Sequence, residues 1–124
     1  MNNPNQTFQL ASDLLEFVNQ ELNRPEEDVM TTSVCHQTRG IIIDMLTAYL
    51  LLKGKNISAI SDLETLHAMC CQLDAKFSKL DFTSMRCHPI KLQGEKAYCM
   101  DIEHVRNCFD IANKVKETVS YYFN

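Results

Sequence analysis

The chain has 124 residues, 45% of them hydrophobic and 23% charged, with a formal net charge of −4 at pH 7. These values are typical of one globular domain, here residues 1–124, that can bury a core without disulfides or metals. Lys and Arg are scattered singly, so the sequence shows no basic surface that would neutralise many phosphates of a nucleic acid. Only three Gly and three Pro interrupt the chain, which favours long helices over a sheet with many turns.

The sequence shows no secretion or membrane signal. Residues 1–6 are polar and uncharged, unlike a signal peptide. The most apolar stretch, Ile41 to Leu52, contains Asp44 and is shorter than the ~20 residues of a membrane span. We therefore predict a cytoplasmic protein without membrane association, whose six cysteines are mostly free because cytosolic thiols stay reduced. The common phosphate-loop, dinucleotide and nucleophile-elbow motifs are absent, and we predict no cofactor.

The first two helices are predicted from apolar spacing and from Pro25. Thr7 to about Leu22 predicts one amphipathic helix, because apolar residues recur three and four positions apart. Pro25 ends that helix and begins the second, which is expected to run unbroken to Leu52 or Lys53 with Gly54 as its C-cap. The apolar stripe of the first helix consists of Ala11, Leu14, Leu15, Val18 and Leu22.

The remaining chain predicts two more helices and a loop. A capping box at Ser61–Glu64 begins a helix that is expected to end near Leu80. Residues 81–99, interrupted by Pro89 and Gly94, predict a long ordered loop, a feature that is often functional. The last helix is expected to have Asp101 as its N-cap. The seam of the third helix is Leu63, Leu66, Cys70, Leu73, Phe77 and Leu80, and the apolar face of the last is Val105, Phe109, Ala112, Val115 or Lys116, Val119 and Tyr122.

Together these elements predict an all-α fold. We expect a largely antiparallel, up-and-down bundle of four to five helices around one long central helix. From Ile41 onward the second helix is apolar nearly all round, so this half is expected to be the central element or part of a subunit interface.

Four segments between Cys35 and Phe123 carry a family resemblance. They are the long helix that begins Cys35-His-Gln and ends at Gly54, the helix start Asp62-Leu-Glu-Thr-Leu66, the loop element Met85-Arg-Cys-His-Pro89, and the closing amphipathic helix. These segments resemble the HEPN family of small helical domains, whose loop element is Arg-Tyr-Pro. The resemblance implies a bundle of the HEPN type.

The resemblance also implies a choice of functions. Many HEPN proteins are metal-independent ribonucleases that use an Arg followed, after four to six residues, by a His. Others are non-catalytic partners of a small nucleotidyltransferase encoded beside them, and others bind nucleotides. In this chain Arg24, Arg39, Arg86 and Arg106 all lack a His at that spacing.

The missing His favours a non-catalytic HEPN-like accessory module. Such a module binds a nucleotide or partners a small nucleotidyltransferase, in a pair of the toxin–antitoxin kind. Two alternatives stay open. One is a ribonuclease with a degenerate Arg/His site acting on RNA, and the other is an interaction protein without a ligand.

The predicted loop contains one candidate nucleotide-binding set, Arg86, His88 and Lys91. Arg grips phosphate through two parallel hydrogen bonds, and His and Lys add donors. The alternative is that Arg86 anchors the loop to a helix end or to an acidic side chain.

The long helix carries a second candidate set, His36, Arg39 and Asp44, together with Gln37. Gln37 and Asp44 are two turns apart on one face of the helix. A carboxylate among isoleucines needs solvent or a charged partner, so the alternative for Asp44 is a salt bridge at the edge of the core.

Two further features bear on metals and assembly. His67 with Cys71, and His104 with Cys108, have helical i, i+4 spacing, but a tetrahedral zinc site needs four ligands, and we predict no metal site. The apolar half of the long helix and the tail at residues 121–123 exceed what one small bundle covers, which predicts a homodimer.

Overall fold

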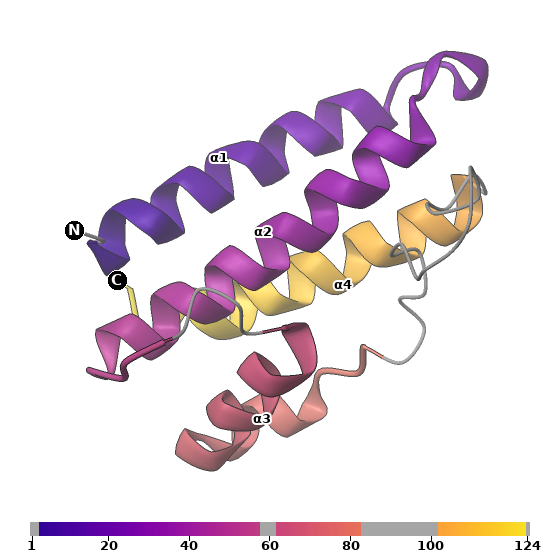
Figure 1. The fold of residues 1–124 in the computed structure, drawn as a ribbon. Coiled ribbons are helices and arrows are strands. Elements are labelled where there is room, and N and C mark those ends of the chain that lie inside the picture. Colours follow the sequence, from indigo (N-terminus) through magenta and orange to yellow (C-terminus); the bar gives the residue numbers. More distant parts are fainter. Residues whose placement is uncertain (1–2, 58–61, 83–101, 124) are drawn as a thin grey trace.

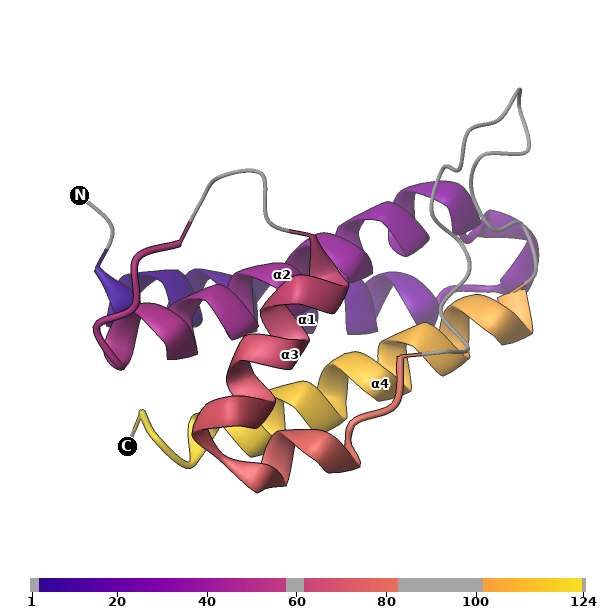
Figure 2. The same cartoon turned by 60° about the horizontal axis from the view of Figure 1, so that its bottom comes forward.

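The computed structural model describes residues 3–57, 62–82 and 102–123, and these ranges are helical with no β-strand. Figure 1 shows α1 and α2 running antiparallel, and α2 and α4 running in the same direction, with α3 crossing below them. A view from another side shows the same crossing (Figure 2). The predicted all-α helical bundle is therefore confirmed. The elements are α1 Pro4–Leu22, the 3₁₀ helix η1 Glu26–Asp28, α2 Thr31–Leu52, α3 Leu63–Leu73, the 3₁₀ helix η2 Ala75–Lys79, and α4 Ile102–Ser120.

Helix α1 begins three residues before the predicted start at Thr7. Asn3 is its N-cap, and the Asn3 side chain accepts hydrogen bonds from the backbone N–H groups of Asn5 (2.9 Å) and Gln6 (3.4 Å). Pro4 occupies the first turn, where its missing N–H costs nothing. The helix ends at Leu22, as predicted from Pro25.

The prediction of one helix from Pro25 to Leu52 is wrong at its start. Residues 26–28 form only the 3₁₀ turn η1, and Met30 has non-helical angles of φ −89° and ψ 84° before α2 begins at Thr31. Val29 lies in the connection between α1 and α2, and its side chain is buried in the core. The chain bends here because this side chain packs into the core. A β-branched residue also loses side-chain freedom in a helix, which makes the break less costly here.

The C-terminus of α2 is the one predicted. Gly54 has a left-handed φ of 77°, and its N–H donates to the carbonyl of Leu51 at 3.0 Å. The N–H of Lys55 donates to the carbonyl of Leu50 at 2.9 Å. These two bonds form a Schellman cap, which favours Gly at this position.

Helix α3 ends at Leu73, not at Leu80 as predicted. Asp74 is extended, with φ −153°, and its side chain accepts a hydrogen bond from the N–H of Lys76 at 2.9 Å. Asp competes with helical backbone bonding in this way, so η2 begins instead. The seam survives the break except at Leu73, which is exposed, while Phe77 is fully buried. At the other end Asp62 is the N-cap, and Ser61, the predicted cap, lies outside the described residues.

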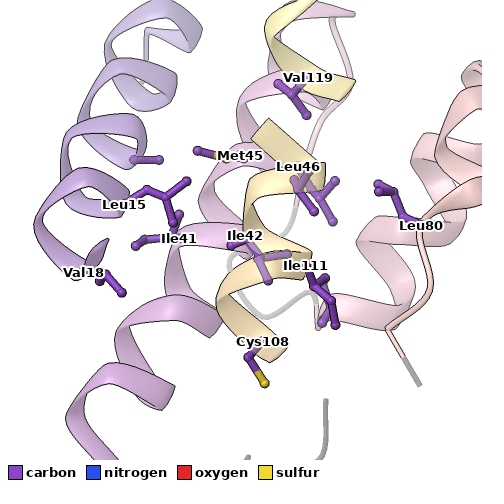
Figure 3. Close-up of a cluster of buried hydrophobic side chains, with 14 of the residues drawn as sticks. Leu15, Val18, Ile41, Ile42, Met45, Leu46, Leu80, Cys108, Ile111 and Val119 are labelled. Atoms are coloured by element: carbon purple, nitrogen blue, oxygen red, sulfur yellow. The ribbon is translucent and has the colours of Figure 1, made fainter. Parts of the chain in front are cut away.

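Helix α2 is the centre of the core, as predicted. Figure 3 shows its side chains between those of α1, such as Val18, and those of α4, such as Ile111. Ile41, Met45 and Leu46 are each at most 1% exposed. The predicted apolar face of α4 is buried at Val105, Ala112, Val115 and Val119, whereas the predicted N-cap Asp101 lies outside the described residues.

The aromatic tail closes one end of the bundle. Phe123 stacks on Phe8 with ring centroids 4.8 Å apart, and Tyr122 packs on Tyr49 at the same centroid distance. The hydroxyl of Tyr122 donates to a carboxylate oxygen of Asp74. This tail thus joins the start of α1 to the end of α2 and to η2 (Figure 1).

The structure also tests the predictions for the cysteines and for membrane-spanning helices. Cys70, Cys71 and Cys108 form no disulfide, in agreement with the prediction that the cysteines are mostly free, and Cys35, which is disulfide-bonded, is the exception among the described cysteines. Cys87 and Cys99 lie outside the described residues. Among the helices that the structure describes, none has both the length and the apolar composition needed to cross a membrane.

Candidate functional site

The loop set Arg86, His88 and Lys91 lies outside the described residues. Phosphate binding by these three side chains therefore stays a prediction. The same holds for most of the predicted loop at residues 81–99.

The second candidate set lies along α2. Hydrogen bonds from Thr65 lower the pKa of Asp62, and the charge of Arg39 adds a smaller lowering. Arg39 is half-buried on the side of α2 that faces the start of α3. His36 and Asp44 are exposed. Arg39 and Asp44 are five residues apart, which places them on different sides of a helix.

Asp44 meets solvent. Partial burial of its carboxyl raises the pKa of Asp44, and no charged group of the described residues contributes to that shift. Among the described residues, Arg24 and Glu21 form an ion pair at 3.2 Å. A salt bridge between Asp44 and a charged residue outside the described ranges, such as Arg86, stays a prediction. Gln37, on the same face, donates to the hydroxyl of Ser33 at 3.1 Å.

The residues in and beside the two predicted His/Cys pairs make contacts that hold the fold together. The Nε2 atom of His67 lies 2.7 Å from the carbonyl oxygen of Phe77, so this ring connects α3 to η2. Burial raises the pKa of the Cys70 thiol to about 12, which keeps it protonated near neutral pH. Cys108 is buried in the core. Within the described ranges, no three His, Cys, Asp or Glu side chains form a group that could hold a metal ion.

The most distinctive exposed feature of the described chain is an apolar stripe on α1. Leu10, Leu14 and Phe17 are 64%, 46% and 57% exposed. Their i, i+4, i+7 spacing places them on one side of the helix. Met30, 65% exposed, lies at the end of this stripe, and we call these four residues the α1 surface. Leu14 was predicted to be in the core, and its exposure corrects that prediction.

A shallow cavity extends the α1 surface toward the start of α2. It has a volume of about 160 Å³, and Phe17, Met30 and Val34 form its apolar part. Glu21 and Arg24 line its polar part and form the exposed ion pair described above. The α1 surface therefore continues into a hollow that one side chain of a partner could fill.

The opposite side of α1 faces α4. A second cavity of about 140 Å³ lies there, and its lining includes Glu16 and Asn19 of α1 with Asn113 and Lys116 of α4. Because Phe17 and Asn19 are two residues apart, their side chains lie on opposite sides of the helix. The α1 surface thus lies on the side of α1 away from α4 and borders the start of α2.

The sequence contains a signal for this surface, a second apolar stripe on α1. The spacing of apolar residues alone does not show which of the two stripes is buried. Leu10, Leu14 and Phe17 repeat at helical spacing just as Ala11, Leu15 and Val18 do. The two stripes lie side by side on α1, and the tertiary fold buries only the second.

Comparison with known proteins adds no relative. No family model matches the chain, and neither the curated proteins nor the solved structures contain a match.

Proposed function

We propose that the chain is a non-catalytic, cytoplasmic accessory module of the HEPN type that acts by binding protein through the α1 surface. The exposure of Leu10, Leu14 and Phe17 on one side of α1 is the observation that carries this proposal. Four half-exposed side chains of this size present on the order of 400 Å² of apolar surface, a patch size that is often functional on a monomer.

The proposal selects among the roles that the family resemblance implies. Partnering a small nucleotidyltransferase requires an exposed docking surface, and the exposure of the α1 surface supports that role. Nucleotide binding depends on Arg86, His88 and Lys91, and it is the additional role that we propose for that loop. The ligand-free interaction protein, an alternative above, would use the same α1 surface.

The first test is the effect of one charge on binding. The proposal predicts a small nucleotidyltransferase encoded beside this chain and a complex of the two purified proteins. Phe17→Glu should abolish the complex by placing a carboxylate in the apolar stripe, while Asn19→Glu, the same charge on the opposite side of α1, should leave it intact. If Phe17→Glu leaves every association of the chain unchanged, the α1 surface is not its binding site.

The second test concerns catalysis. Purified protein incubated with total RNA should leave the RNA intact. Cleavage by the wild-type chain that disappears in Arg106→Ala would show a degenerate ribonuclease site and overturn the non-catalytic assignment. Arg106 suits this test because it is exposed on α4, so the substitution leaves the core unchanged.

A further inference from the structure

We propose that the cavity between α1 and α4 binds a small free amino acid, a molecule that carries one ammonium group and one carboxylate. This α1–α4 cavity has a volume of about 140 Å³ and is lined by Leu15, Glu16, Asn19, Phe109, Asn113 and Lys116. It lies on a different side of α1 from the α1 surface, and its described lining includes none of the loop residues Arg86, His88 and Lys91. The proposal therefore goes beyond the proposed function and does not depend on it.

Each helix contributes two polar side chains to the cavity. Glu16 and Asn19 are three residues apart on α1, so they lie on one face of that helix. Asn113 and Lys116 have the same spacing on α4. Leu15, which is 3% exposed, lines the cavity where α1 meets the core. The α1–α4 cavity is thus a polar hollow that borders the apolar core.

The two charged residues lie at about the same level on the two helices. The helices α1 and α4 run antiparallel, and Phe8 of α1 stacks on Phe123 just after α4 (Figure 1). Glu16 lies about two helical turns along α1 from Phe8. Lys116 lies about two turns back along the chain from Phe123. The carboxylate and the ammonium group therefore border the cavity from its two sides, and the same count places the two asparagines opposite each other.

The polar groups of the cavity have no partner within the described chain. Glu16 and Lys116 form no ion pair, either with each other or with another described residue. The carboxamides of Asn19 and Asn113 make no hydrogen bond to a described residue. Asn113 and Lys116 are half-buried, so a ligand that bonds to them would replace contacts with water that burial has removed.

These four groups are complementary to a small amino acid. The carboxylate of Glu16 attracts the ammonium group of such a ligand, and the ammonium group of Lys116 attracts its carboxylate. Because the two residues have no net charge together, a simple anion or cation would lie beside a like charge, which disfavours its binding. The carboxamides of Asn19 and Asn113 can donate and accept hydrogen bonds, so they suit a hydroxyl or amide side chain on the ligand.

The volume of the cavity limits the size of the ligand. At about 30 Å³ for each water molecule, 140 Å³ corresponds to about five waters. Glycine, alanine and serine are molecules of about this size, whereas a nucleotide is several times larger. The half-buried Phe109 lines the same cavity and offers apolar contact to the carbon atoms of the ligand. The α1–α4 cavity is therefore distinct in its ligand from the loop that we propose for nucleotide binding.

The first experiment titrates the full, ¹⁵N-labelled chain with L-serine and follows the NMR spectrum. Because ion pairs that are open to solvent are each weak, we expect a Kd on the order of 1 mM. The side-chain amide signals of Asn19 and Asn113 should shift and reach saturation. Acetate and methylammonium, which each carry one of the two charges, should bind at least about 10-fold more weakly at equal ionic strength. Shifts that do not saturate, or that acetate reproduces at the same concentration, would overturn the proposal.

The second experiment removes each charge of the cavity in turn. Glu16→Gln and Lys116→Gln should each weaken serine binding at least about 10-fold. Lys114→Gln and Glu117→Gln make the same changes at exposed positions of α4 that do not line the cavity, and they should bind serine as the wild type does. Circular dichroism should show native helix content in all four variants. If the two cavity variants bind serine as tightly as their controls, the α1–α4 cavity is not the site.

The third experiment reverses one charge, which gives a gain of binding that misfolding does not produce. Glu16→Lys places two ammonium groups at the cavity, so this variant should lose serine and bind malonate, a small dicarboxylate, more tightly than the wild type. Equal malonate binding by the two proteins would overturn the assigned pairing of charges.

The outcomes separate this inference from the proposed function. Phe17→Glu should leave serine binding unchanged, because Phe17 does not line the α1–α4 cavity. If the wild-type chain binds no serine while Phe17→Glu still abolishes the nucleotidyltransferase complex, the proposed function stands and this inference alone fails.

Discussion

Two apolar regions of this molecule differ in whether the chain itself covers them. At one end, Tyr49, Phe77 and Tyr122 pack together, and we call these three rings the aromatic cluster. On the side of the bundle, the α1 surface has no described element over it. Only the aromatic cluster buries its apolar surface within a single chain.

Polar groups explain how the aromatic cluster is closed. The Tyr122 hydroxyl donates to Asp74, and the ammonium groups of Lys53 and Lys76 lie over the Tyr122 ring at 5.1 Å and 5.7 Å from its centroid. Such contacts let a ring sit at the edge of a core with its polar atom satisfied. The side chains of Leu10, Leu14 and Phe17 have no polar atoms, so only apolar contact can cover them.

The largest expected difference between the two regions is in the response to losing a ring. Phe77→Ala should lower the free energy of unfolding by about 3–5 kcal/mol, because Phe77 is fully buried and its removal leaves a cavity. Phe17→Ala should change it by about 0.5 kcal/mol or less in the monomer, because that ring is mostly in solvent. Urea denaturation at concentrations too low for association would measure both. Similar losses would show that the two rings are equally buried.

A smaller effect is expected from removing one hydroxyl of the cluster. Tyr122→Phe keeps the ring and deletes its hydrogen bond to Asp74, which should cost about 1.5 kcal/mol, the lower range for bonds to charged groups at a half-buried site. Tyr121→Phe is the control, since Tyr121 is 65% exposed. The melting temperatures of the two variants should differ. Equal melting temperatures would show that the Tyr122 hydrogen bond makes no net contribution to stability.

The alkaline pH dependence should come from the same cluster. Burial, and then the charge of Asp74, raise the pKa of Tyr49 above its usual value of 10.0. The folded protein therefore holds this proton more tightly than the unfolded chain. The stability from Tyr49 is complete below pH 10 and declines as pH rises from 10 through the folded pKa. Melting temperatures between pH 8 and 12 should fall more steeply in wild type than in Tyr49→Phe, and parallel curves would contradict the assignment.

The smallest expected effect is that of a surface cation. The Lys76 ammonium lies 3.3 Å from the centroid of the exposed Tyr121 ring. Lys76→Gln should cost about 0.5–1 kcal/mol, the range for exposed cation–π pairs. Lys79→Gln, on the same 3₁₀ turn, is the control. If both variants unfold at the wild-type temperature, the contact adds nothing to closing the aromatic cluster.

The candidate binding residues were less predictable than the fold. Patterns in the sequence identified polar sets by residue type, yet the fold places Arg39 and Asp44 on different sides of α2. The sequence does not predict the α1 surface, because Leu14 fits either apolar stripe of α1 when the helix is considered alone. Which stripe is buried depends on contacts with residues far away in the chain.

The sequence alone determined the features that depend on neighbouring residues. Asn3 and Pro4 determine where α1 begins, Gly54 determines where α2 ends, and the apolar run from Ile41 makes α2 the central helix, because caps and periodicity act within a few turns.

The tertiary structure decided the break at Val29 and the exposure of Leu10, Leu14 and Phe17, and it reinforced the local break at Asp74. Val29 leaves the helical path because the core receives its side chain, and Asp74 ends α3 where its carboxylate also meets Tyr122. The α1 surface stays open because α2 and α4 pack on the other sides of α1. These outcomes depend on contacts between distant segments, and local pattern carries no information on which of two apolar stripes such contacts will cover.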